Sequence, residues 1–174
     1  MESPAIPPWV FTVEPCDGES LSHFLGRFRR ANYSSSNELG QKTGLGAVLA
    51  RWEKFRFIPP PTQKQLEALA ELVRVDAERL RLMLPPQGVG IKHEPMRLCA
   101  ACYSEEPYHR LEWQFKETRG CDRHQLRLLS ECPNCKARFS MPAIWEEGQC
   151  QRCLMSFSAM VVRQKPYWVE EFVL

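Results

Sequence analysis

Apolar residues recur at helical spacing through the first half of the chain. Across residues 19–32 they fall three, four, seven and ten positions after the first, which lines one face of an α-helix. Residues 45–57 repeat this spacing and predict a second amphipathic helix. The two predicted apolar faces consist of Leu21, Phe24, Leu25, Phe28 and Ala31, and of Leu45, Val48, Leu49, Trp52 and Phe55.

Polar residues predict where three further helices begin. Ser35 is followed by Glu38 and Thr62 by Gln65, which is the spacing of a capping box. In that motif each of the two side chains bonds the backbone N–H of the other residue. Asp76 is typical of the N-cap of a last short helix.

Two proline-rich stretches divide the chain, at residues 58–61 and 85–90. Proline lacks an N–H and fixes φ, so neither stretch continues a helix. After the second stretch, the long periodic segments give way to short ones closed by cysteine pairs. We therefore expect a helical domain over residues 1–90, followed by two small modules over residues 91–128 and 129–174.

The helix pair over residues 62–84 has two interpretations. Two short helices joined by a tight turn at residues 74–76 are typical of a helix-turn-helix. The same pattern fits a plain antiparallel helix pair, because such units recur on many folds. A recognition helix usually presents polar or basic residues at its N-terminus to base edges. Asp76 and Glu78 would repel phosphates there, so we do not expect this helix to read the major groove.

The cysteines after residue 90 come in pairs with two residues between the members. A tight turn in each half-site aims two side chains at one point, and two half-sites supply the four ligands of a tetrahedral zinc ion. The half-sites are Cys99 with Cys102, Cys121 with His124, Cys132 with Cys135, and Cys150 with Cys153. Pairing in chain order gives one site of three cysteines and a histidine and one of four cysteines. An interleaved pairing is the alternative.

Composition favours metal ligands over disulfides. The first residues are interrupted by prolines and lack a basic segment before an apolar core, so we expect no signal peptide. No stretch approaches the ~18 apolar residues of a membrane helix. We therefore expect a cytoplasmic protein with no membrane partner, where paired cysteines are kept reduced.

Both predicted ligand sets are complete, so we expect two structural Zn²⁺ ions and no catalytic metal. Each module is too short to bury enough apolar surface by itself, and zinc supplies on the order of 10–16 kcal/mol in such peptides. Alternation in residues 111–116 predicts a strand, and residues 138–141 and 157–162 could form others. The expected fold is an α-helical N-terminal domain with a helix-turn-helix-like unit, followed by two tandem zinc-bound β modules of the zinc-finger or zinc-ribbon kind.

Cys16, His93 and His109 are further residues with possible metal chemistry outside these sets. Cys16 is expected to be a small apolar residue near a helix start. His93 and His109 have no ligand partner two residues away. We expect His109 to be a surface residue or a packing partner.

Basic residues cluster beside aromatic ones in two places. The first cluster is Arg27, Arg29 and Arg30 around Phe28, and the second is Arg51, Lys54 and Arg56 among Trp52, Phe55 and Phe57. Such mixtures can bind a phosphate backbone and stack bases. Helical spacing instead favours the aromatic residues as core. In both cases we expect the basic side chains to be free to meet nucleic acid or an acidic protein surface.

No catalytic arrangement is visible. The chain has no nucleophile elbow, phosphate-cradling glycine loop or His-Glu-x-x-His motif, and its carboxylates are scattered. With closed metal sites, this favours a binding protein and not an enzyme.

The order of these features resembles the TniQ family of transposon proteins over nearly the whole chain. The combination of motifs is specific, although each motif alone is not. The motifs are Gly18-Glu19-Ser20-Leu21 near the start, Cys99-x2-Cys102, the tract around Trp113, Cys121-x2-His124, and Cys132-x2-Cys135. In its short length, the chain most resembles the small TniQ of type V-K CRISPR-associated transposons.

The resemblance implies a non-catalytic targeting adaptor in RNA-guided DNA transposition. Such an adaptor links a CRISPR effector with its guide and tracr RNA to the AAA+ regulator TnsC, whose DNA-bound filament it caps. Target DNA and a small-subunit ribosomal protein as host factor are further implied partners. The alternative is a stand-alone zinc-containing DNA- or RNA-binding regulator. The family's zinc ligands carry over onto the eight half-site residues, whereas Arg27, Arg29, Arg30, Arg51, Lys54 and Arg56 are contact candidates on charge alone.

Overall fold

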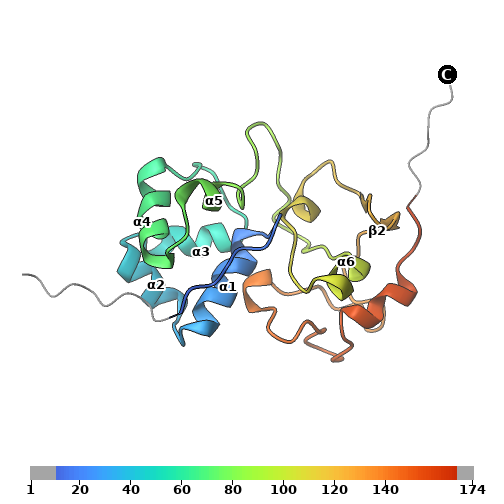
Figure 1. Cartoon of the computed structure of the whole chain (residues 1–174). Helices are drawn as coiled ribbons and strands as arrows, with labels where there is room; N and C mark the ends of the chain where they lie inside the picture. The colour runs from blue at the N-terminus through green and yellow to red at the C-terminus, as the bar shows by residue number, and fades with distance from the viewer. Residues whose placement is uncertain (1–10, 168–174) are drawn as a thin grey trace, which may run out of the picture.

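The computed structural model describes residues 11–167, and Figure 1 shows its two parts side by side. Five short helices form the helical part at one end of the molecule. Their bounds are α1 Leu21–Ala31, α2 Ser36–Thr43, α3 Ala47–Glu53, α4 Gln63–Val73 and α5 Ala77–Arg81. Helix α3 packs on α1 and α2, while α4 packs on α2 and α5. The predicted helical character of the N-terminal part is confirmed.

The capping residues set the helix starts as predicted. Both capping boxes are present, at Ser35 with Glu38 and at Thr62 with Gln65. The Asp76 carboxylate accepts the Glu78 N–H at 2.8 Å and so caps α5. Each box satisfies backbone donors that a helix start otherwise leaves unpaired.

Helix α5 is short for a recognition helix. It has five residues and follows a turn in which Arg74 takes the left-handed conformation, with φ 56°. A helix of that length extends about 7.5 Å. Its first turn is acidic, as the sequence indicated. The pair α4 and α5 is therefore a compact helix hairpin at the edge of the helical part.

The aromatic residues of the helical part are core. Phe28, Trp52 and Phe55 are each 1% exposed, so their rings are not available to stack bases. Phe24 and Leu25 of α1 are fully buried with them. The helical spacing therefore identified the apolar faces correctly.

The second part contains little regular structure. It has α6 Ala100–Glu105, the 3-10 helices η1 Leu111–Gln114, η2 Pro142–Ile144 and η3 Ser158–Arg163, and the antiparallel strands β1 Gly120–Cys121 and β2 Leu126–Arg127. Helix α6 packs on η3. We call residues 91–167 the metal-held part, because they contain two clusters of side chains that could hold metal ions.

The predicted strand over residues 111–116 is wrong. The Trp113 N–H bonds the Arg110 carbonyl and the Phe115 N–H bonds the Glu112 carbonyl, which closes η1. Leu111, Trp113 and also Gln114 are buried, so the segment does not have one polar and one apolar face. The alternating pattern predicts a strand because it treats Gln114 as an exposed polar residue, whereas its side chain is buried and hydrogen-bonded.

The other two predicted strands also differ from the structure. Residues 138–141 contribute one isolated bridge, between Glu131 and Arg138. Residues 157–162 lie largely in η3, where the Met160 N–H bonds the Phe157 carbonyl and Met160 is buried. Neither segment has a neighbouring strand long enough to pair with, so local bonds form instead.

The two parts share a close interface. Helix α1 packs on η2, and a Cβ at Gly26 would collide with the Ala143 carbonyl oxygen. The Ala143 N–H donates to Ser22 Oγ at 3.1 Å, and Arg30 Nη1 donates to the Ala143 carbonyl at 2.9 Å. One core of buried residues runs across residue 90. The division into separate domains stays a prediction, since packing crosses the proposed boundary.

Candidate metal centres

Cys99, Cys102, Cys121 and His124 meet at one point in the metal-held part, with their donor atoms within 4.8 Å of one another. The Sγ atoms of Cys102 and Cys121 are 3.4 Å apart. His124 Nδ1 lies 3.9 Å from the sulfur of Cys99, 3.3 Å from that of Cys102 and 3.5 Å from that of Cys121. We call this set the first cluster.

These distances match the edges of a zinc tetrahedron. Zn–S bonds of about 2.3 Å and Zn–N bonds of about 2.0–2.1 Å place tetrahedral ligands roughly 3.8 Å apart for two sulfurs and roughly 3.6 Å apart for sulfur and nitrogen. Three cysteines and one histidine are a common structural zinc set. The donor set therefore fits Zn²⁺ and has no open position.

The half-sites of the first cluster come from different local structures. Cys99 is the N-cap residue of α6, and Cys102 lies within that helix. Cys121 ends β1 and pairs with Leu126, so a tight turn carries His124 back toward it. Gln125 completes the turn in the left-handed conformation, with φ 53°. A helix start and a turn thus face each other across the cluster.

His124 is oriented by a carboxylate outside the ligand set. Its Nε2 lies 2.7 Å from Glu105 Oε1, near the end of α6. With Nδ1 directed at the sulfurs, Nε2 carries the proton and donates to Glu105. Arg123 also contacts this carboxylate, at 2.9 Å. Such partners fix the tautomer and the ring orientation of metal-bound histidines.

Cys132, Cys135, Cys150 and Cys153 form the second cluster, again with all donors within 4.8 Å. Cys132 Sγ lies 3.6 Å from Cys153 Sγ, and Cys135 Sγ lies 3.5 Å from Cys150 Sγ. These separations again agree with sulfur edges of roughly 3.8 Å around zinc. The pairing is the sequential one; the interleaved alternative is wrong.

The second cluster is made of two matched turns. In the first, the Lys136 N–H bonds the Cys132 carbonyl at 2.9 Å, and Lys136 is left-handed with φ 63°. In the second, the Leu154 N–H bonds the Cys150 carbonyl at 2.9 Å, and Leu154 also has φ 63°. The same turn conformation thus occurs twice, and each turn presents two thiols to the cluster, as in a zinc ribbon.

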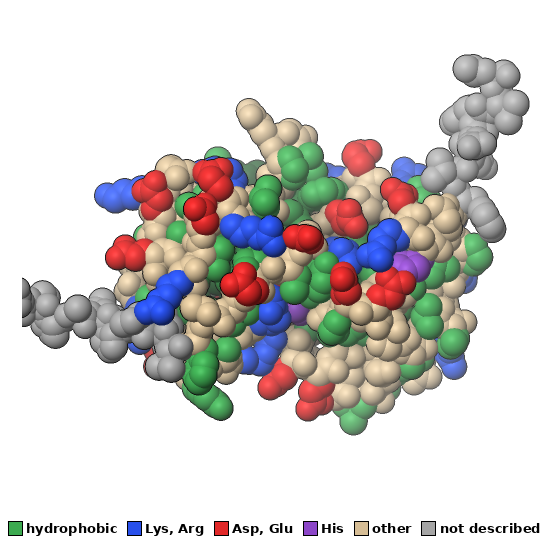
Figure 2. Space-filling model, viewed as in Figure 1, with side chains coloured by type: hydrophobic (Ala, Val, Ile, Leu, Met, Phe, Trp, Pro, Cys, Tyr) green, Lys and Arg blue, Asp and Glu red, His purple; other side chains and the backbone are tan. Residues whose placement is uncertain are grey.

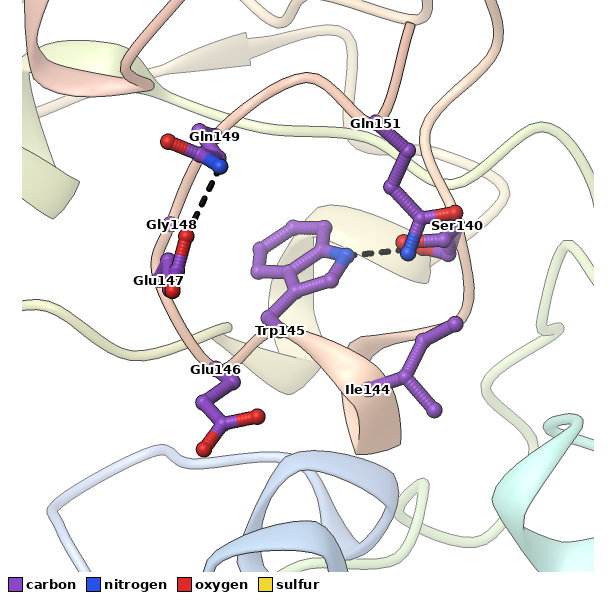
Figure 3. A pocket seen from close by; sticks show the side chains of 8 residues that line it. All are labelled: Ser140, Ile144, Trp145, Glu146, Glu147, Gly148, Gln149 and Gln151. Atoms are coloured by element: carbon purple, nitrogen blue, oxygen red, sulfur yellow. Dashed lines mark hydrogen bonds between the residues drawn. The ribbon is translucent and has the colours of Figure 1, made fainter. Parts of the chain in front are cut away.

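The loop leading to Cys150 is anchored by Trp145. Figure 3 shows this loop around the indole, whose Nε1 donates to the Ser140 carbonyl at 2.8 Å. The Tyr103 ring of α6 meets Trp145 edge-on at 6.0 Å between centroids. A Cβ at Gly148 would crowd the Tyr103 hydroxyl, at 2.5 Å. The two clusters are therefore connected by aromatic packing.

Disulfides do not explain either set. All eight cysteines are free, and sulfur separations of 3.4–3.6 Å are far beyond the roughly 2.05 Å of a disulfide. Thiolates are the form that binds metal. Hydrogen bonds from the thiols of Cys102 and Cys121 lower the pKa of Cys99 to about 3, while hydrogen bonds with Cys121 and Cys99 raise the pKa of Cys102. A hydrogen bond from the Asn134 side chain lowers the pKa of Cys153 to about 6.

The remaining histidines lie outside both clusters. His109 is fully buried and packs edge-on against Trp113 and Trp145, so it is the packing partner that the sequence allowed. Its Nδ1 lies 2.9 Å from Ser20 Oγ, across the interface between the two parts. His93 Nδ1 lies 2.8 Å from the Phe55 carbonyl.

Three of the six basic contact candidates are held inside the fold. Arg27 bonds the buried Glu19 carboxylate through Nε at 2.8 Å and Nη2 at 2.6 Å. Arg29 is buried and forms an ion pair with Glu53 of α3. Arg30 donates to backbone carbonyls beside η2. The expectation that these arginines are free is wrong, because each has an internal acceptor.

The second group of candidates is more accessible. Lys54 and Arg56 are exposed, while Arg51 is half-buried and donates to the Ile58 carbonyl at 2.6 Å. On the face shown in Figure 2, basic and acidic side chains are interspersed. A partner role for this group stays a prediction.

Sequence reasoning missed Glu105 and Glu19. No spacing rule pairs Glu105 with His124, because their proximity depends on how α6 faces the second turn. Glu19 stands four residues before His23 and eight before Arg27, and helical geometry alone would place all three near one face. The burial of Glu19 could not be predicted from the sequence.

Within the described residues, no helix is both long and apolar enough to cross a membrane.

No curated protein matches the chain. A family model described as TniQ matches residues 10–128, which include the helical part and the complete first cluster but end before the second. The chain therefore belongs to the TniQ family, a family of transposition-associated adaptor proteins.

Proposed function

We propose that the protein is a non-catalytic targeting adaptor in RNA-guided DNA transposition. It joins a CRISPR effector and its guide and tracr RNA to the AAA+ regulator TnsC, caps the regulator's filament on target DNA, and so recruits the transposase. The observation that carries the proposal is the TniQ match over residues 10–128, which encloses a metal cluster with no open position.

We further propose that both clusters hold structural Zn²⁺. The donor sets and their separations fit this ion, and four protein ligands leave no site for an activated water. The ions fix loops that contain only short helices and two-residue strands. The result is a rigid scaffold with surfaces free for protein and RNA partners, including a small-subunit ribosomal protein as host factor.

The direct test is a pull-down with the regulator. Immobilised chain is mixed with TnsC, with and without ATP and duplex DNA, and retention is measured. We expect retention to require ATP and DNA, because a cap recognises the filament and not the free regulator. Absence of retention under all conditions would contradict the adaptor role. So would a sequence-specific footprint by the isolated chain, which is the outcome expected of a stand-alone regulator.

A second test addresses the accessible basic residues. Lys54→Glu and Arg56→Glu should weaken partner association while leaving the fold intact, because both side chains are exposed. Lys64→Glu on α4 is the matched control, since it reverses one exposed charge elsewhere in the helical part. Equal association by all three variants would remove this group from the contact surface.

A further inference from the structure

A groove of about 730 Å³ lies where the helical part meets the metal-held part. Lys54 and Arg56 line it just after α3, residues 93–96 contribute one stretch, and Arg138 contributes from the segment that follows Cys135 of the second cluster. Segments expected to belong to three separate modules thus form one concave surface. Its volume falls in the range of about 300–1,000 Å³ that is usual for ligand pockets.

The rim of the groove is mainly basic. Lys54, Arg56 and Arg138 are all exposed. Among the described residues, Lys54 and Arg56 form no ion pair, and Arg138 only approaches Glu94, at 3.9 Å between two highly exposed groups. Such a distant, solvated pair is worth little. The rim therefore favours an anionic ligand.

The floor of the groove is apolar and adaptable. Met96, Phe139 and Met141 line it together with Pro95. Thioether side chains are flexible and polarizable, and they recur on surfaces that accept varied apolar side chains. A floor of this kind beneath a basic rim is complementary to a ligand that carries both carboxylates and apolar groups.

The floor is poorly suited to nucleic acid. Binding single strands relies on exposed aromatic rings that stack on bases. Of the two rings that line the groove, Phe139 is 8% exposed and meets Trp145 and Phe157 edge-on within the core, and the His93 ring is held by a contact to the Phe55 carbonyl. The Glu94 carboxylate at the rim would repel a phosphate or a carboxylate placed beside it, but it can accept a peptide N–H, a donor that a phosphate backbone lacks.

We propose that this groove binds an acidic segment of a protein partner in which carboxylates alternate with apolar side chains. The apolar side chains would sit on the half-buried Pro95 and Met141, over the buried Met96 and Phe139, and the carboxylates would meet Lys54, Arg56 and Arg138. The proposal rests on the adaptor function above, because an adaptor needs a surface for a partner segment.

The second cluster completes this surface. Arg138 is bridged to Glu131, and the Cys132 N–H bonds the Ala137 carbonyl at 2.8 Å, so the turn around Cys132 and Cys135 positions one wall of the groove. Metal loss from this cluster should therefore abolish binding even where the helical part stays folded.

The test is a fluorescence anisotropy titration with the full metal-loaded chain. The probe is a short labelled peptide in which Glu alternates with Leu and Phe. Control probes replace Glu with Lys, or Leu and Phe with Ser, and an oligouridine of similar length represents RNA. We expect saturable binding of the first probe only.

Variants connect the signal to the groove. Arg56→Glu and Arg138→Glu should each weaken the peptide about tenfold, whereas Lys64→Glu on α4 should leave it unchanged. Circular dichroism and metal content verify that each variant is folded. No saturable peptide binding, equal binding by all variants, or RNA binding that depends on Arg56 and Arg138 would each overturn the proposal. The regulator is absent from this titration, so its failure and a failed TnsC pull-down are separate results.

Discussion

The helical part and the metal-held part are stabilised in different ways. In the helical part, capped helices bury Phe24, Leu25 and Trp52 against one another, and backbone hydrogen bonds follow from the helices. The metal-held part has one six-residue helix, three 3-10 helices and a ladder of two-residue strands. Its loops are fixed by eight converging side chains. The two parts are therefore stabilised by different interactions, and we expect metal removal to destabilise only the metal-held part directly.

Ligand substitutions should give the largest effect and should separate the two clusters. Cys102 is 1% exposed and lies in α6, which packs on η3, whereas Cys153 is more exposed in a turn. We expect Cys102→Ser to lose most of the structural contribution of its ion, on the order of 10 kcal/mol in small zinc modules, and to disorder the metal-held part. Cys153→Ser should disturb the second cluster and its groove wall more locally. Metal content and near-ultraviolet circular dichroism measure the difference; equal loss in both variants would contradict it.

The ion pair between Arg29 and Glu53 should give the next largest effect, within the helical part. Arg29→Ala leaves a buried carboxylate without its partner, which costs about 3–5 kcal/mol. The matched control combines Arg29→Met with Glu53→Leu, which removes both charges and should restore much of the stability. Urea unfolding measures both. A small loss in the single variant would show that the pair is solvated.

The contact between the parts can be tested at Gly26. Alanine would favour α1 by about 1 kcal/mol through helix propensity, but its Cβ would collide with the Ala143 carbonyl. We expect a net loss of about 1–3 kcal/mol from the forced shift of α1 against η2. Gln41→Ala at an exposed position of α2 is the control and should be neutral or slightly stabilising. If Gly26→Ala is also stabilising, the two parts are not in close contact.

His109 should give the smallest effect, as a pH dependence. Burial lowers the pKa of His109 well below its usual value, so the folded chain keeps it neutral while the unfolded chain takes up a proton below about pH 6.5. Its contribution to stability is present above that pH and is lost as the pH falls. Between about pH 7.5 and 5.5 the loss is about 1.4 kcal/mol.

The corresponding measurement is urea unfolding over this pH range, with metal content followed in parallel. His109→Gln keeps a polar side chain but does not titrate, so its stability should depend less on pH than that of the parent chain. Identical pH profiles for the two chains would show that His109 is accessible to protons in the folded state.

The sequence was most informative where one local pattern determines the structure. Capping pairs located the starts of α2 and α4, helical spacing identified Phe28 and Trp52 as core, and the cysteine and histidine spacing identified the eight residues that form the two clusters. In each case the physical constraint acts within a few residues. A tight turn can bring two ligands two residues apart to one zinc ion, and that arrangement is visible in the spacing.

The sequence was least informative where distant segments meet. Arg30 was expected to be free, but its acceptors lie near residue 143, more than a hundred positions away. The alternation around Trp113 wrongly predicted a strand. Gln114 is buried because its side chain bonds the carbonyls of Lys92 and Pro95, and these distant bonds are not visible in the local pattern. The interface between the two parts, where the groove lies, could not be predicted from the sequence of either part alone.

The most direct test of the account is metal stoichiometry combined with chelation. Elemental analysis of the purified chain should give two zinc ions per chain, and a strong chelator should abolish the near-ultraviolet signal of Trp113 and Trp145 while most far-ultraviolet helix signal remains. Fewer than two ions in a fully folded chain, or an unchanged near-ultraviolet spectrum after complete zinc removal, would contradict the claim that metal holds the second part together.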